Sequence, residues 1–167
     1  MLYLIAEAIL ARLPAPLHRI ALRGAHRVRK AWWRVRRPSL EGCRILALDK
    51  AGRVLLVRHS YGSPDWMPPG GGMKRGEDPI QAALREFSEE LGCGLTNPRL
   101  ADVAQDTLHG AGNKVHIVIG QCLGVPRPDL REITHAVFFA PDDLPEDLLP
   151  ALRGRIEVWV LGEGQEG

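Results

Sequence analysis

Three glutamates lie close together in the segment REFSEELG, residues 85–92. In a helix, Glu86, Glu89 and Glu90 stand at positions i, i+3 and i+4, so their carboxylates share one patch. Like charges at this spacing destabilise a helix by roughly 0.2–0.5 kcal/mol per pair, and no lysine at i+4 relieves the repulsion. Clustered carboxylates supply the oxygen ligands that a hard divalent cation such as Mg²⁺ takes. The spacing therefore indicates a metal site, with a solvated acidic helix face as the alternative.

The segment that carries the glutamates has clear helix boundaries. Asp78 is a favourable N-cap, Pro79 suits the first helical position, and Gly92 is typical of the residue that ends a helix. On a helical wheel the apolar residues occupy a face separate from the carboxylates: Ile80, Leu84, Phe87 and Leu91. We therefore expect a helix between Pro79 and Gly92 that turns one face to the core and presents its glutamates on another.

A loop rich in Gly and Pro, residues 61–77, precedes this helix. Its glycines allow the backbone to approach a ligand closely. Lys74 and Arg75 in the loop, and Arg58 just before it, are candidate donors to substrate phosphates. Trp66 is a candidate to stack on a base. For each cation the alternative is a solvated surface charge, and for the tryptophan it is a loop anchor.

The spacing of the loop and the helix matches a known family motif. Gly71, Glu77 and the run REFSEELGC, residues 85–93, resemble the Nudix box, GX5EX7REUXEEXGU, where U is a bulky apolar residue. All seven fixed positions match, and the mild departures, Phe87 and Cys93 at the U positions, concern packing alone. The resemblance covers about residues 42–150. It implies an α/β (α+β) fold, a Nudix-type α/β/α sandwich with a mixed β-sheet.

The resemblance also implies a reaction and a metal. Nudix enzymes cleave a nucleoside diphosphate linked to another group, with water attacking phosphorus and Mg²⁺ or Mn²⁺ assisting. By position, Glu86 and Glu90 are implied as the main metal ligands. Glu89 is implied as a third ligand or as the carboxylate that handles the attacking water, and the Gly71 carbonyl as a further ligand. The expected substrate is a nucleotide-type small molecule.

Two more roles follow from the resemblance or from position. The resemblance implies that Arg85 pairs with Glu77 and so holds the loop against the helix. Glu132, just before the apolar segment ITHAVFFA, is a candidate fourth carboxylate or base, with a surface residue as the alternative. Submotifs typical of ADP-ribose, dinucleoside polyphosphate, NADH and coenzyme A substrates are absent, so no substrate is selected. A catalytically silent binding or regulatory module is the second function class, and the intact glutamates argue against it.

The remaining pattern predicts a small mixed domain over residues 41–160. Period-two and apolar runs predict a hairpin over 44–49 and 53–59 and three further strands over 99–107, 114–123 and 133–140. Two helices are expected after the strands: a short one over PDDLPEDLLP, residues 141–150, and one over residues 151–160.

The charge is divided unevenly along the chain. Residues 1–40 hold nine Lys and Arg against one Glu, whereas the rest holds 13 basic and 19 acidic residues. Apolar positions at helical spacing in the first part predict a basic amphipathic helical arm. We expect this arm to pack on the body or to join a homodimer; the alternatives are contact with an anionic membrane or with nucleic acid. The last residues, 161–167, are predicted to be a disordered tail.

The sequence favours a cytoplasmic protein. The three cysteines are widely spaced and form neither a metal motif nor a disulfide framework. The apolar run at the N-terminus is about half the roughly 20 residues that a membrane helix needs, and Glu7 interrupts it. Its positive charges follow the run, so neither a cleaved signal nor a transmembrane helix is expected.

Overall fold

The computed structural model describes residues 40–108, 111–148 and 150–161. The expected basic arm and disordered tail fall outside these residues, apart from Leu40 and Leu161 at their boundaries, and both stay predictions. The homodimer, membrane and nucleic-acid contacts assigned to the arm stay predictions with it. Within the described ranges, no helix is long and apolar enough to cross a membrane.

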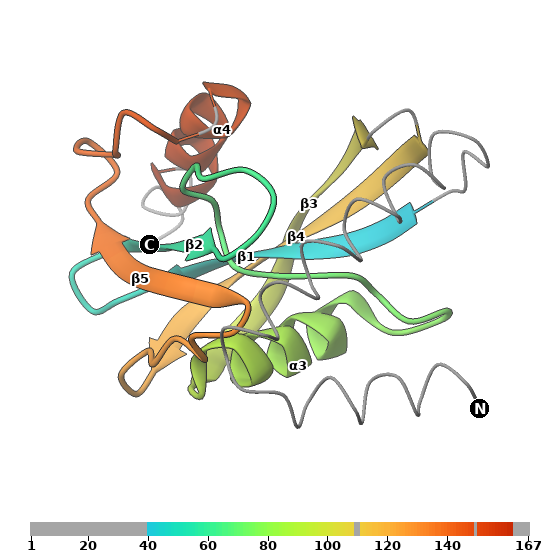
Figure 1. Cartoon of the computed structure of the whole chain (residues 1–167), viewed down its shortest axis with the longest axis horizontal. Coiled ribbons are helices and arrows are strands. Elements are labelled where there is room, and N and C mark those ends of the chain that lie inside the picture. Colours follow the sequence, from blue (N-terminus) through green and yellow to red (C-terminus); the bar gives the residue numbers. More distant parts are fainter. Residues whose placement is uncertain (1–39, 109–110, 149, 162–167) are drawn as a thin grey trace.

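Five strands form a single mixed sheet in the order β3-β4-β1-β2-β5 (Figure 1). They are β1 (Leu40–Leu48), β2 (Val54–His59), β3 (Gly94–Leu108), β4 (Ala111–Leu123) and β5 (Ile133–Phe139). β1 runs parallel to β4, whereas the β1–β2, β2–β5 and β3–β4 pairs are antiparallel. The expected hairpin is present, and its turn is stabilised by the Asp49 carboxylate, which accepts the N–H groups of Ala51 and Arg53, both at 2.9 Å.

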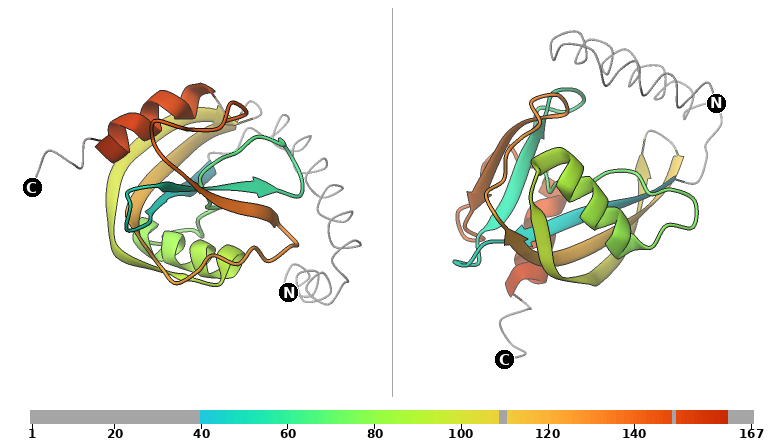
Figure 2. Two further views of the ribbon diagram at one scale, coloured as in Figure 1. Left: turned by 90° about the vertical axis from the view of Figure 1, so that its left-hand side faces the viewer. Right: turned by 90° about the horizontal axis from the view of Figure 1, so that it is seen from below.

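Alternation along the central strands builds one apolar cluster on each face of the sheet. The helix α3 (Pro79–Leu91) covers one cluster and α4 (Pro150–Leu161) covers the other. Figure 2 shows the two helices on opposite sides of the sheet. Strand residues of the α3 cluster include Ile45, Leu55, Val57 and Val118, and those of the α4 cluster include Leu46, Val54, Leu56, Ile117 and Ile119. This arrangement confirms the mixed α/β sandwich.

Several expected element boundaries were wrong. β1 starts at Leu40 instead of residue 44, and β4 starts at Ala111 instead of residue 114. β3 starts at Gly94 instead of residue 99, because an edge strand can accommodate Pro98 where the register shifts between Thr96 and Arg99. Residues 141–148 form turns instead of a short helix. At the end of this segment, Leu148 forms an isolated β-bridge with Trp66. The final helix begins at Pro150 and agrees with the expected one.

Candidate active site

The caps of α3 set where its glutamates lie. The Asp78 carboxylate accepts the N–H groups of Ile80 at 2.9 Å and Gln81 at 3.1 Å, so the helix starts at Pro79. Gly92 adopts the left-handed conformation with φ of 62°, and its N–H donates to Ser88. The predicted helix is thereby confirmed. Phe87 and Leu91 point into the α3 cluster and are fully buried.

Five carboxylates line one cavity of about 70 Å³. Glu86, Glu89 and Glu90 come from α3, while Asp129 and Glu132 come from the segment between β4 and β5. The fold therefore brings Glu132 to the glutamates of the box, as its position suggested. Asp129 was not among the expected residues. Its only sequence signal is an aspartate in the polar run RPDLRE, which is typical of a turn.

The three glutamates of α3 differ in their exposure and electrostatics. Glu90 is 6% exposed, whereas the Glu89 side chain is 63% exposed. The pKa of Glu90 is raised to about 8, mainly by burial and also by the charges of Glu86 and Glu132, while the hydrogen bond from Gly70 acts in the opposite direction. Burial also raises the pKa of Glu86, opposed by Arg85. Water therefore stabilises the charges of Glu86 and Glu90 poorly, and a bound cation would relieve that cost.

Arg85 connects the box loop to the helix. Its Nε and Nη2 donate to the two oxygens of Glu77 at 2.9 and 3.0 Å, so the predicted ion pair is present and bidentate. Its Nη1 donates to Glu86 at 2.6 Å, and its Nη2 also donates to the Gly72 carbonyl at 3.1 Å. The guanidinium lowers the pKa of Glu77 to about 2. The planar guanidinium of arginine, with its five N–H groups, can contact all of these partners at once, whereas the ammonium group of a lysine could not.

Two glycines bring the loop backbone against the carboxylates. The Gly70 N–H donates to Glu90 at 3.1 Å, and φ at this residue is 135°, a conformation that favours glycine. A Cβ on Gly71 would lie 2.5 Å from Oε2 of Glu86. The Gly71 carbonyl accepts the N–H of Cys43 at 2.9 Å, which ties the loop to β1. The box glycine is therefore required by the close approach of the Glu86 carboxylate.

The donor chemistry of this cavity suits a hard divalent cation, because all its charged groups are carboxylates. Within residues 40–161, as far as the structure describes them, no three His, Cys, Asp or Glu side chains are already arranged around one metal position. Glu86 is engaged by Arg85 and Glu90 accepts the Gly70 N–H. A metal would have to compete with these contacts. The ligand roles of Glu86, Glu89, Glu90 and Gly71 accordingly stay predictions.

Two further residues lie at the site: sequence reasoning missed Arg44 and left the role of Tyr61 ambiguous. Arg44 on β1 donates through Nη1 to the Gly70 carbonyl at 3.0 Å, which fixes the other side of that peptide. Tyr61 donates its hydroxyl to Oε2 of Glu132 at 3.0 Å. Neither residue belongs to the box spacing, and only the approach of β1 and of the loop after β2 brings them here.

Arg58 and Trp66, two candidate substrate-binding residues, lie on the face of the sheet that carries α4. Trp66 is 8% exposed and belongs to the α4 cluster, with its ring 5.1 Å from that of Phe139. The Arg58 guanidinium lies 4.6 Å from the Trp66 ring and pairs with Asp147. The structure thus places them with each other and not with the carboxylates, and their contact with substrate stays a prediction.

Lys74 and Arg75 lie exposed in the loop between Gly71 and α3. The backbone N–H of Lys74 donates to Glu77 at 2.7 Å, so this part of the loop is held by the same carboxylate that pairs with Arg85. Both side chains are exposed, and both residues lie just before Glu77 in the sequence. Phosphate contact by either one stays a prediction.

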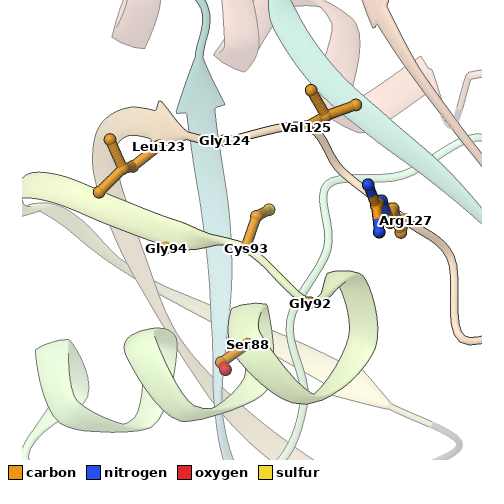
Figure 3. Close-up of a pocket in the computed structure, with 8 residues that line it drawn as sticks. All are labelled: Ser88, Gly92, Cys93, Gly94, Leu123, Gly124, Val125 and Arg127. Atoms are coloured by element: carbon orange, nitrogen blue, oxygen red, sulfur yellow. The ribbon is translucent and has the colours of Figure 1, made fainter.

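A second, wider cavity of about 550 Å³ lies at the C-terminal end of α3. Figure 3 shows its lining, which comes from the last turn of the helix, the start of β3 and the end of β4 with the residues after it. None of the five clustered carboxylates lines it. Its lining is a mixture of glycines, exposed apolar side chains such as Leu123 and Val125, and Arg127. We therefore take the smaller, charged cavity as the candidate active site.

Comparison with known proteins identifies the family of the fold. Residues 40–159 match the NUDIX domain family, which is well over half of the chain. The chain belongs to the Nudix family. The Nudix match spans every strand and nearly all of α4, so it covers the fold as well as the box.

Several curated relatives of this Nudix chain are named RNA pyrophosphohydrolase. The one from Roseobacter denitrificans is 34% identical over 123 residues, which is 70% of this chain and 57% of that protein. The one from Photorhabdus laumondii is 41% identical over 56 residues, 34% of this chain and 31% of that protein. The chain therefore spans little more than half the length of the first of these relatives and about a third of the second.

Solved structures give the same fold. The MutT NUDIX hydrolase from Burkholderia pseudomallei has a TM-score of 0.64 and 29% identity, over 71% of this chain and 96% of that one. The MutT protein from Methanosarcina mazei Go1 has a TM-score of 0.68 over 78% of this chain and 99% of that one. At 20% identity, the second supports the fold alone.

Proposed function

We propose that this Nudix protein is a divalent-metal-dependent pyrophosphohydrolase that cleaves a phosphoric anhydride bond in a nucleotide-type substrate. The observation that supports it most is the cavity where carboxylates from α3 meet Glu132 from the opposite wall. Because relatives carry the name RNA pyrophosphohydrolase, RNA with a 5′-triphosphate is the substrate class to test first.

Glu86 and Glu90 would hold Mg²⁺ or Mn²⁺, with Glu89 as a third carboxylate and the Gly71 carbonyl as a further donor. When bound, the cation polarises phosphoryl oxygens, neutralises developing charge and lowers the pKa of bound water. The buried position of Glu90 supports this assignment, since a carboxylate 6% exposed is stable as an anion only when positive charge balances it.

The side chains around the metal position would orient and transfer protons. Arg85 keeps Glu86 turned toward the cavity and keeps the loop closed on the helix. Glu89 or Glu132 accepts the proton of the attacking water, and both line the cavity. Lys74 and Arg75 on the exposed loop are available to phosphates. Phosphoryl transfer depends mainly on positioning and electrostatics, so this small set of groups is sufficient.

The test is hydrolysis by the purified full-length protein with Mg²⁺, Mn²⁺ or EDTA. The panel contains 5′-triphosphorylated and capped RNA, nucleoside di- and triphosphates, ADP-ribose, nucleotide sugars and dinucleoside polyphosphates. Products are read as free phosphate with and without added pyrophosphatase or phosphatase, which identifies the bond that breaks. We expect metal-dependent turnover of at least one class and none in EDTA.

The opposite outcome is equally informative. Turnover that persists in EDTA would contradict the role of the carboxylates as metal ligands. Absence of turnover with both metals across the whole panel would contradict the enzyme proposal and support the second function class, a Nudix-fold binding or regulatory module.

A further inference from the structure

Glu132 comes from residues 124–132, a segment between β4 and β5 without regular secondary structure. Two backbone contacts dock this segment on α3. The N–H of Arg127 donates to the Leu91 carbonyl at 2.8 Å, and the N–H of Asp129 donates to the Glu90 carbonyl at 3.1 Å. Carbonyls of the last helical turn have no partner within the helix. The segment therefore satisfies the end of α3 and is placed directly beside Glu90.

The Asp129 side chain then organises the backbone that follows it. Its Oδ1 accepts the N–H groups of Arg131 at 3.0 Å, Glu132 at 2.9 Å and Ile133 at 2.9 Å, and its Oδ2 accepts that of Glu132 at 3.2 Å. Leu130, inside this turn, has φ of 57°, in the left-handed region that few residues other than glycine adopt. A turn through such a residue needs specific stabilisation, which the carboxylate of Asp129 supplies.

The geometry points to Asp129 as the positioning residue for Glu132: it fixes the backbone that holds the Glu132 carboxylate opposite the glutamates of α3. This inference rests on the proposed function, because it assigns Asp129 a part in the same site. Contacts from the end of β2 fix Glu132 from the other side. Ser60 donates its N–H to the Glu132 carbonyl at 2.8 Å, and Tyr61 donates its hydroxyl to the carboxylate.

Asp129 acts through Glu132 and not by contact with substrate or metal. Three N–H groups converge on its Oδ1, so that oxygen is committed to the turn. Its Oδ2 makes one longer contact with the same backbone. Asn at this position would keep an oxygen in the place of Oδ1 while removing the charge, whereas Ala would remove all four hydrogen bonds. The two substitutions therefore separate positioning from charge.

The first experiment compares kcat and KM of Asp129→Ala and Asp129→Asn on the best substrate of the panel. We expect Asp129→Ala to lower kcat on the order of 10²-fold, since a displacement of about 1 Å of a catalytic group can cost that much. We expect Asp129→Asn to restore kcat to within about fivefold of the original protein, because the three bonds to Oδ1 persist. KM should change little in either variant. Equal losses in both would show a direct role of the charge and overturn the inference.

A double-mutant cycle with Glu132→Gln tests whether Asp129 acts through Glu132. We expect Glu132→Gln alone to lower kcat by about 10²- to 10⁴-fold, the usual contribution of a general base. In that background, Asp129→Ala should add less than about a twofold further loss, because the group it positions is already gone. The same loss in both backgrounds would mean that Asp129 acts independently, which contradicts the inference.

Hydrogen exchange separates this inference from the proposed function, because it needs no turnover. Asp129→Ala should speed exchange at the amides of Arg131 and Glu132 while leaving the amides of α3 unchanged, and Asp129→Asn should restore the protection. Asp142→Ala, which removes an exposed carboxylate after β5, is the matched control and should change neither. Unchanged exchange in Asp129→Ala would overturn the inference. The exchange measurement can be made on an inactive protein. Absence of activity in the original protein would therefore contradict the proposed function and leave the inference about Asp129 standing.

Discussion

The two faces of the sheet use an arginine in different ways. On the α3 face, Arg85 contacts Glu77, Glu86 and a loop carbonyl, in a region where carboxylates crowd together. On the α4 face, Arg58 lies over Trp66 and pairs with one half-exposed carboxylate, Asp147. Both arginines flank the same loop in sequence. The excess of negative charge makes the α3 face the candidate site, whereas the contacts of the α4 face are those of a packed core.

Among the substitutions that test the difference between the two faces, we expect Glu90→Gln to have the largest effect on activity. Glu90→Gln keeps the side-chain volume and an oxygen for the Gly70 N–H, but it removes the charge that a cation needs. We expect kcat to fall on the order of 10³-fold or more, as when a main electrostatic group is removed from a phosphoryl-transfer site. Steady-state hydrolysis with Mg²⁺ measures it. Glu146→Gln, an exposed position near α4, is the control, and equal activity of the two variants would remove the distinction between the faces.

The next effect tests the close approach between the loop and the helix. Gly71→Ala would place a Cβ within 2.8 Å of both Glu86 carboxylate oxygens, so the carboxylate must move. We expect activity to fall on the order of 10- to 100-fold, with circular dichroism unchanged. Gly72→Ala is the matched control, because a Cβ there meets nothing within 4 Å. Comparable losses in both variants would show that loop flexibility matters instead of the position of Glu86.

A third prediction concerns pH in the absence of metal. The pKa of Glu90 is raised from 4.5 to about 8, so the folded state holds this proton after the unfolded state has released it. Glu90 therefore contributes stability below about pH 4.5 that is lost progressively as pH rises to about 8. Thermal unfolding of the metal-free protein should show this decline, and Glu90→Gln should flatten it. A profile that rises over the same range in the original protein and not in the variant would contradict the assignment.

Glu77 provides an internal control of opposite sign for that experiment. Arg85 lowers the pKa of Glu77 from 4.5 to about 2. Its contribution is complete above about pH 4.5 and is lost as pH falls toward 2, a window below that of Glu90. Added Mg²⁺ should stabilise the protein most at high pH, because a metal ligand must be deprotonated.

The smallest expected effect lies on the α4 face. Arg58→Ala removes a contact with the Trp66 ring and a partly exposed ion pair. Together they are worth about 1 kcal/mol of unfolding free energy, which urea unfolding measures, and we expect kcat and KM to stay within about twofold. A clear increase in KM would instead support contact of Arg58 with substrate. In that case the α4 face would belong to the binding site and the contrast between the faces would fail.

Residue types and their spacing were enough to predict the helix with its caps, the hairpin, the mixed sheet and the family. These features depend on local patterns: the Asp78 cap, the glycine after Leu91, and alternation in strands that bury both faces. The pair of Arg85 and Glu77 was implied by the resemblance to the Nudix box, and the structure contains it.

The side of the cavity opposite the α3 glutamates depends on tertiary structure. Asp129 reaches the glutamates only because the segment before β5 docks on the end of α3, and Tyr61 contacts Glu132 because β5 pairs with β2. Arg44 reaches the Gly70 carbonyl from β1. Trp66, equally near the box in sequence, is directed to the opposite face and buried there. Local propensity carries no information about which face of a sheet a loop residue joins, since that choice depends on long-range pairing and on which apolar cluster has room for the side chain.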